Sequence, residues 1–211
     1  MNKKWIWITV LIGMILTGIL MIGPVMSDVE TPSYRVVESQ EDIEIRHYDP
    51  MIVANVKIVG DRENTLRKGF QLLADYIFGN NTIVQDIAMT APVQQQIYKK
   101  ISMTAPVQQQ AMDTSWEVSF VMPSGYNMVT LPRPNNDSIV LEEIPAEKFA
   151  VIIFSGTSSS ENIEKYEKKL MRYLARNNIE AIGTPKYAFY NPPWTLPQLR
   201  RNEVMMKMVS R

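Results

Sequence analysis

The segment Pro50-Met-Ile-Val-Ala-Asn-Val-Lys-Ile-Val-Gly60 decides how this chain folds. Its β-branched and apolar residues predict a well-buried strand over residues 51–59, which begins after a turn at Asp49-Pro50. The residues that follow predict a helix that ends at Gly79-Asn80. Four apolar residues recur on one face of that helix: Leu66, Phe70, Leu73 and Ile77. The segment therefore predicts a strand that leads directly into an amphipathic helix.

A second segment, Glu147-Lys-Phe-Ala-Val-Ile-Ile-Phe-Ser-Gly156, repeats this arrangement. It precedes a helix that we expect to begin near Ser158, whose spacing to Glu161 fits a capping box. Further strands are predicted around the two units, at residues 34–38, 42–48, 138–144, 187–190 and 203–209. The order indicates an α+β fold. Two βαββ-like halves would close one antiparallel sheet or barrel with both helices packed on it.

The chain begins with a long apolar segment. From Trp5 to Met26 there are 22 residues without a charge, preceded by two lysines. A helix of this length spans about 33 Å, enough for a hydrocarbon core of about 30 Å. We therefore expect residues 1–30 to be a single-pass membrane anchor and linker, with the domain of residues 31–211 outside the cytoplasm. The alternative is a signal peptide cleaved near Val25-Met26-Ser27 and a secreted domain.

The composition argues against several classes of function. Lys+Arg and Asp+Glu balance at 22 each, so no long-range field favours nucleic acid as a partner. The absence of cysteine excludes disulfides, thiolate metal sites and thiol nucleophiles. His47 is the single histidine, too few for a zinc site, and glycine-rich nucleotide-binding loops are absent. The paired carboxylates Glu142-Glu143 fall in an expected strand, where neighbours face opposite sides, so we interpret both as solvated.

What remains is binding rather than catalysis. The chain contains 14 methionines together with 4 Trp, 9 Tyr and 6 Phe. These side chains provide adaptable, polarizable surface suited to a flat hydrophobic ligand, although a methionine-rich core would have the same composition.

A ten-residue segment is present twice in the first half. Ile87-Ala-Met-Thr-Ala-Pro-Val-Gln-Gln-Gln96 recurs as Ile101-Ser-Met-Thr-Ala-Pro-Val-Gln-Gln-Gln110, with nine identical positions. Two copies are too few for a solenoid. We interpret them as a local duplication whose copies pair as a hairpin, with Pro92 and Pro106 at edges or bulges.

Four stretches, in order, resemble the SOUL heme-binding family. They are Tyr34–Val56 with Glu44-Ile-Arg-His-Tyr-Asp-Pro50, Ile87-Ala-Met-Thr-Ala-Pro-Val93, Val118-Ser-Phe-Val-Met-Pro-Ser124, and Tyr190-Asn-Pro-Pro-Trp-Thr-Leu-Pro197 followed by Arg200-Arg-Asn-Glu-Val204. The resemblance implies a distorted antiparallel β-barrel of two βαββ halves with two helices. It also implies non-covalent, b-type binding of heme or a related tetrapyrrole in an apolar groove beside the first helix. The fold is similar to GyrI-type sensing domains, so binding of other hydrophobic small molecules is the alternative.

The resemblance also implies which residues hold the tetrapyrrole. His47 falls where some SOUL proteins carry a histidine proposed as the axial ligand, and a neutral imidazole is a standard ligand of iron. Arg67 matches an arginine near the propionates, a role that suits a permanent cation. The alternatives are a solvated histidine at a strand end and a plain surface arginine. Three further pocket residues are expected on the same helical surface as Arg67: Phe70, Gln71 and Ala74.

Overall fold

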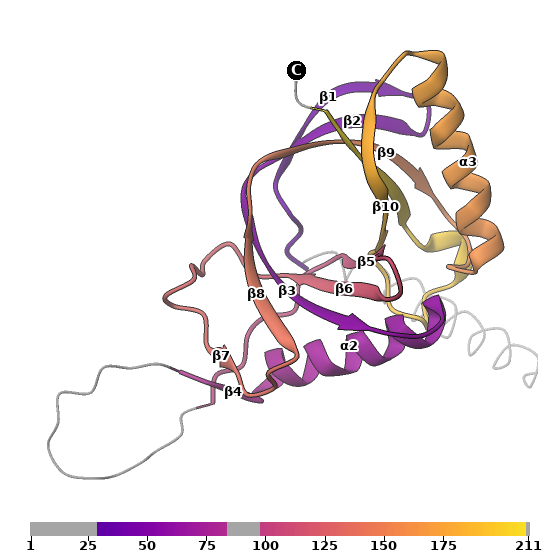
Figure 1. Cartoon of the computed structure of the whole chain (residues 1–211). Coiled ribbons are helices and arrows are strands. Elements are labelled where there is room, and N and C mark those ends of the chain that lie inside the picture. The colour runs from indigo at the N-terminus through magenta and orange to yellow at the C-terminus, as the bar shows by residue number, and fades with distance from the viewer. Residues whose placement is uncertain (1–28, 84–97, 210–211) are drawn as a thin grey trace, which may run out of the picture. The chain divides into compact units, whose positions relative to one another are not determined.

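Nine strands form one sheet in the computed structural model of this protein, which describes residues 29–83 and 98–209 (Figure 1). The strands are β1 (Tyr34–Gln40), β2 (Ile43–Tyr48), β3 (Met51–Ile58), β5 (Val107–Ala111), β6 (Trp116–Val121), β8 (Ile139–Ile144), β9 (Glu147–Phe154), β10 (Ala181–Phe189) and β11 (Asn202–Met208). The helices are α2 (Arg62–Phe78), α3 (Ser160–Arg176) and the short 3₁₀ helix η2 (Pro197–Leu199). A separate two-stranded pair joins β4 (Asn81–Thr82) to β7 (Arg133–Pro134).

The strand order reveals the two halves that the sequence predicts. Across the sheet the order is β1-β2-β9-β11-β10-β5-β6-β3-β8, and all neighbours are antiparallel. One half is β3-α2-β5-β6 and the other is β9-α3-β10-β11. The two halves meet where β10 pairs with β5, so that β9 and β3 occupy equivalent positions on either side of this central pair. The α+β class with two helices is therefore confirmed.

The expected closed barrel is wrong, because the sheet is open. Among the described residues, β1 pairs with β2 alone and β8 pairs with β3 alone. The physical reason lies in the edge strands. Glu142 and Glu143 are exposed on β8, and Arg35 and Glu38 are exposed on β1. Charged side chains on edge strands disfavour further strand pairing, which leaves these two edges apart.

Both helices cover the same face of the curved sheet, on its outside in Figure 1. Alternate residues of each strand face the helices. Residues of β3 and β6 pack with α2 in one core cluster, which includes Val56, Leu73 and Phe120. Residues of β9 and β11 pack with α3 in another, which includes Ile152, Leu170 and Val204. The opposite, concave face of the sheet is left free of helices.

Helix α2 has the predicted length, but the set of residues that it buries differs from the predicted set. It begins after Asp61, whose side chain accepts a hydrogen bond from the Asn64 backbone N–H at 3.0 Å, and it ends at Gly79, which has a φ of 130°. Leu73 and Ile77 are buried as predicted. Phe70 is 38% exposed, because buried Gly69 makes the contact with β6 and turns Phe70 toward the surface.

Helix α3 begins one residue later than expected. Its N-cap is Ser159, which accepts a hydrogen bond from the Asn162 backbone N–H at 3.4 Å. The predicted capping box of Ser158 and Glu161 is therefore wrong. The Ser158 carbonyl instead accepts a hydrogen bond from Arg62 at 2.6 Å, which joins the starts of the two helices.

The second copy of the duplicated segment supplies β5. This strand has β10 on one side and β6 on the other, so the expected hairpin between the copies is wrong for residues 107–111. The first copy, residues 87–96, lies outside the described residues, and so does the apolar segment 5–26. Within residues 29–83 and 98–209, neither helix is long and apolar enough to cross a membrane.

Candidate functional site

The four helical residues of the expected tetrapyrrole site lie together on one flank of α2, where Phe70 still contacts the sheet. Arg67, Phe70 and Gln71 are exposed, and Ala74 is half-buried. The Phe70 ring meets the buried ring of Phe120 edge to face, with 5.5 Å between the ring centres. This contact holds one exposed aromatic ring in a fixed position on the helix.

The apolar surface continues toward the end of α2. Phe70, Ala74 and Phe78 are four residues apart, so they lie one above another on the helix. Phe78 is 56% exposed, and the Lys100 ammonium lies 5.6 Å from the centre of its ring. Arg67 stands one turn before Phe70 and donates a hydrogen bond to Asn64 at 2.9 Å. The α2 outer face (Arg67, Phe70, Gln71, Ala74 and Phe78) is thus an apolar stripe with a cation at each end.

Sequence reasoning missed Phe78 and Lys100. The spacing of Phe78 from Phe70 was a signal for the first. Lys100 lies 22 positions after Phe78 in the sequence and had no such signal, because the turn that returns it to α2 depends on tertiary contacts. The Ile101 N–H donates to the Ile77 carbonyl at 2.8 Å, and Asn81 donates to the Lys99 carbonyl at 2.8 Å.

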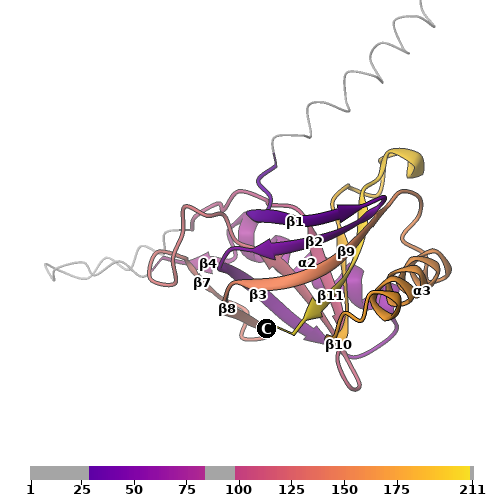
Figure 2. The same ribbon diagram turned by 90° about the horizontal axis from the view of Figure 1, so that it is seen from above.

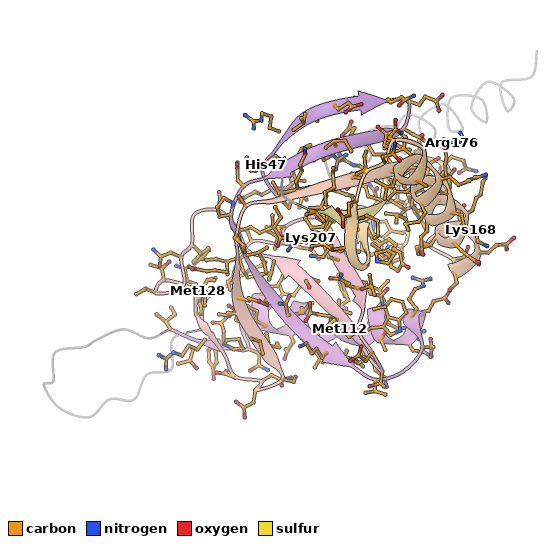
Figure 3. All side chains as sticks on the ribbon, turned by 45° about the horizontal axis from the view of Figure 1, so that its top comes forward. His47, Met112, Met128, Lys168, Arg176 and Lys207 are labelled. Carbon is orange, nitrogen blue, oxygen red and sulfur yellow. The ribbon has the colours of Figure 1, made fainter. Side chains whose placement is uncertain are left out.

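His47 lies apart from the α2 group. It is half-buried on β2, where its cross-strand neighbours are Arg35 and Lys148 (Figure 3). Cross-strand neighbours share a face of the sheet, so two cations flank the imidazole. Helix α2 packs on β3 and β6, which occupy the other half of the sheet. The five expected site residues therefore form two groups on different elements.

The concave face of the sheet contains a cavity that the sequence did not predict. Its volume is about 330 Å³, within the usual range for small-molecule sites. Strands from both halves line it, among them β3 with Met51, Val53 and Asn55 and β10 with Lys186. These residues alternate along the strands with the residues that face the helices. The two-residue period of a strand therefore indicated that they lie on the face opposite the helices. It did not indicate that curvature of the sheet makes that face a cavity.

Polar groups at the floor of the cavity are incompletely paired. Asn55 is 5% exposed and donates a hydrogen bond to Glu142 at 3.0 Å. Glu142 is exposed on β8, as predicted, and it has this partner in addition. The Asn55 Oδ1 atom is buried and has no hydrogen-bond donor within the described residues. Burial lowers the pKa of Lys186, whose ammonium lies 5.7 Å from the centre of the Phe149 ring. In the described part of the chain, no three His, Asp or Glu side chains are placed to hold a metal ion.

A buried ion cluster lies beside this cavity. Glu203 on β11 is fully buried and accepts hydrogen bonds from Arg46 at 3.0 Å, from Arg201 at 2.6 Å and from Tyr190 at 2.9 Å. Burial taken alone would lower the pKa of Arg46, but the Glu203 carboxylate raises it above its usual value. Burial, together with the Glu203 carboxylate, raises the pKa of Tyr190. The cluster therefore keeps both arginines charged and Tyr190 neutral, and it ties β2 to β11.

The fold defines an α+β class of domain, made of two βαββ halves with helices on one face of an open sheet. The chain belongs to the SOUL heme-binding protein family, which matches residues 29–207. It is 28% identical to human Heme-binding protein 2 over 185 residues, which cover 84% of this chain and 85% of that protein.

Two solved structures share the fold. One is the EcmrR C-terminal domain, with a TM-score of 0.57, 13% identity, and coverage of 84% of this chain and 99% of that one. The other is a hydrolase from Listeria innocua, with a TM-score of 0.55, 11% identity, and coverage of 82% and 94%. At these identities the likeness concerns the fold alone.

Proposed function

We propose that this domain binds heme or a related tetrapyrrole non-covalently, without catalysis, on the α2 outer face. Membership of the SOUL family supports the ligand class, as does similarity to a protein named for heme binding. The observation that carries the proposal is the apolar stripe of Phe70, Ala74 and Phe78 with Arg67 and Lys100 at its ends.

The chemistry of this face fits a flat dianion. A porphyrin ring gains by covering exposed aromatic surface, at roughly 25 cal/mol per Å² of apolar area removed from water. Its two propionates require cations, and a guanidinium pairs with carboxylates in a fixed planar geometry. None of the five residues of the α2 outer face is a standard ligand of iron, so this mode of binding rests on apolar contact and charge.

Ligation of iron by His47 is a separate proposal. A heme ligated there would lie over the row formed by Arg35, His47 and Lys148, where the two flanking cations would face the propionates. The two proposals place the same ligand on different elements. Substitutions on α2 and at His47 on β2 can therefore distinguish the two proposals.

We expect Phe70→Ala to weaken hemin binding by about tenfold, since it removes one of the two aromatic rings of the stripe and about 1.4 kcal/mol of contact. The measurement is a titration of hemin into residues 31–211, which form a unit of their own, followed by the Soret absorbance. Met171→Ala is the matched control, because Met171 is similarly exposed, at 45%, on the outer side of α3.

His47→Ala completes the design. An unchanged Soret spectrum together with weaker binding by Phe70→Ala supports the α2 face. A changed spectrum in His47→Ala, with Phe70→Ala unaffected, moves the site to β2. Uptake that never saturates in the unsubstituted protein contradicts heme binding altogether.

The concave cavity supports a second candidate function, binding of another hydrophobic small molecule. The observation in its favour is the buried Asn55 Oδ1, which lacks a donor that a ligand would supply. Two dyes with N–H groups and opposite charge, anionic anilinonaphthalene sulfonate and cationic rhodamine 6G, probe this. We expect Asn55→Leu to weaken the better-bound dye about tenfold, as loss of one buried hydrogen bond implies, and to leave hemin binding unchanged. Exposed Asn135→Leu is the control, and equal dye binding by all three proteins would rule the cavity out.

We also propose that residues 5–26 hold the domain at a membrane, outside the cytoplasm. The support is the length of the uncharged segment and the lysines before it. The N-terminal sequence of the protein isolated from membranes tests this, since a mature chain that begins near Asp28 would indicate cleavage and secretion.

A further inference from the structure

The loop between β10 and β11 exposes three large apolar side chains close together in sequence. Trp194 is 74% exposed, Leu196 is 57% exposed and Leu199 is 69% exposed. Scattered apolar residues on a surface are ordinary, but three within six positions on one projecting loop form a local apolar tip. We call residues 192–199 the Trp194 loop.

Five of the eight backbone carbonyls in the Trp194 loop accept hydrogen bonds. Its three prolines have no N–H to satisfy. Arg200 donates to the carbonyls of Pro193 at 2.5 Å and Thr195 at 2.7 Å. Three other carbonyls accept backbone N–H groups at 2.8–3.1 Å: those of Pro192, Leu196 and Pro197. A loop that pairs its own carbonyls in this way can leave water at a lower cost than an ordinary loop.

The loop is also fixed to the domain. The Gly156 N–H donates to the Pro197 carbonyl at 2.8 Å, and the Arg201 N–H donates to Asn191 at 2.7 Å. These bonds hold the apolar tip outward without any contribution from a partner. The exposed side chains are therefore preorganised rather than collapsed onto the surface.

The tip and the start of the domain lie on the same side. Figure 2 shows the loop between β10 and β11, in yellow, and the chain that leads into β1, in indigo, both on the upper side of the domain. Arg201 donates to the Tyr34 hydroxyl at 3.2 Å, so the base of the loop contacts the first residue of β1. If residues 5–26 cross a bilayer, the eight residue-to-residue steps from Met26 to Tyr34 reach at most about 29 Å. The domain then stays close to the lipid surface.

We propose that the Trp194 loop rests in the interface of a lipid bilayer. Trp is enriched in membrane proteins at the depth of the lipid headgroups, and leucines beside it would reach the upper acyl region. Contact of this loop with lipid would orient the domain on the membrane. The proposal goes beyond ligand binding, and it concerns lipid contact by the domain rather than by the apolar segment.

Because the chain has no cysteine, a single introduced cysteine reports one position. The full chain carrying Leu196→Cys, labelled with the environment-sensitive dye NBD, is reconstituted into phosphatidylcholine vesicles and isolated by flotation. We expect the label to be quenched by nitroxide-bearing lipids and protected from aqueous iodide by severalfold. The matched control is Val129→Cys, which labels another exposed apolar residue, 86% exposed, in a different loop.

Each outcome decides the proposal. Quenching by lipid at position 196 but not at 129 supports it. Equal access of iodide to both labels in floated protein shows that the loop stays in water and overturns it, as does a chain that does not float at all. Protection at 196 without quenching by lipid also overturns it and indicates a protein contact, such as a second copy. Hemin binding is measured separately, so failure of this test leaves the proposed heme binding standing. Failure to float, unlike failure of the quenching, also contradicts the proposed membrane anchor of residues 5–26.

Discussion

Glu203→Gln is expected to lower the free energy of unfolding by about 3–5 kcal/mol, the largest effect that we predict for a single substitution. The carboxylate is fully buried and accepts hydrogen bonds from Arg46 and Arg201. Arg46 is also fully buried. Loss of the negative charge leaves the fully buried Arg46 guanidinium with only the partly exposed Glu44 as a counter-charge, and Arg46 cannot lose its proton to escape.

Urea denaturation of residues 31–211, followed by tryptophan fluorescence, gives this free energy. Glu164→Gln is the matched control, because it makes the same change in an exposed pair with Lys168 and is expected to cost less than about 0.5 kcal/mol. The double variant Arg46→Met with Glu203→Gln should lose less than the sum of the single variants, since it also removes the buried cation that the Glu203 carboxylate neutralises. A Glu203→Gln protein as stable as the control would mean that the cluster does not hold β2 to β11.

The two strand–helix units were predictable because their signals are local. A β-branched run followed by Asp61 and a 3.6-residue period specifies β3 and α2 without reference to the remainder of the chain. The same holds for β9 and α3. Even there, the start of α3 depended on a contact of Ser158 with Arg62, 96 positions away, and sequence reasoning placed it one residue early.

The ion cluster illustrates what sequence reasoning could not reach. Alternation along β2 places Ile43 and Ile45 on one face and Arg46 on the other, and an arginine there is ordinarily solvated. It is buried because the sheet curves and brings Glu203 over it from β11. Curvature and strand order arise from pairing between distant segments, which a period along one strand does not encode. The same cause explains why the cavity and the open edges were not predicted.

The candidate site was predictable in part. Phe70, Gln71 and Ala74 follow from helical spacing once Arg67 is chosen, and the structure does gather them on one face. The spacing did not tell which apolar residues of α2 turn inward. Buried Gly69 decides which side of α2 faces the sheet, because a residue without a side chain lets the helix approach the sheet most closely at that position.

Gly69→Ala is the second large effect that we predict. A Cβ atom at this position would lie 2.6 Å from both the Cβ and the Cγ2 of buried Val118 on β6. Atoms of a packed core cannot approach so closely, so α2 must move away from the sheet, at a cost of about 2–3 kcal/mol. The shift also loosens the contact of Phe70 with Phe120, so hemin binding to the α2 outer face should weaken together with stability.

Two comparisons separate this steric cause from a general intolerance of substitution. Gly125→Ala adds the same methyl group where nothing lies within 4 Å, and its stability should change by less than about 0.5 kcal/mol. Val118→Ala removes the Cγ1 and Cγ2 atoms and keeps the Cβ, so it relieves part of the clash. The double variant should therefore be more stable than the two single effects together imply, and it should regain part of the hemin affinity. If Gly69→Ala is as stable as Gly125→Ala, then α2 does not contact β6 as closely as described here. If stability falls while hemin affinity is unchanged, the tetrapyrrole does not lie on α2, and the row around His47 becomes the site to test.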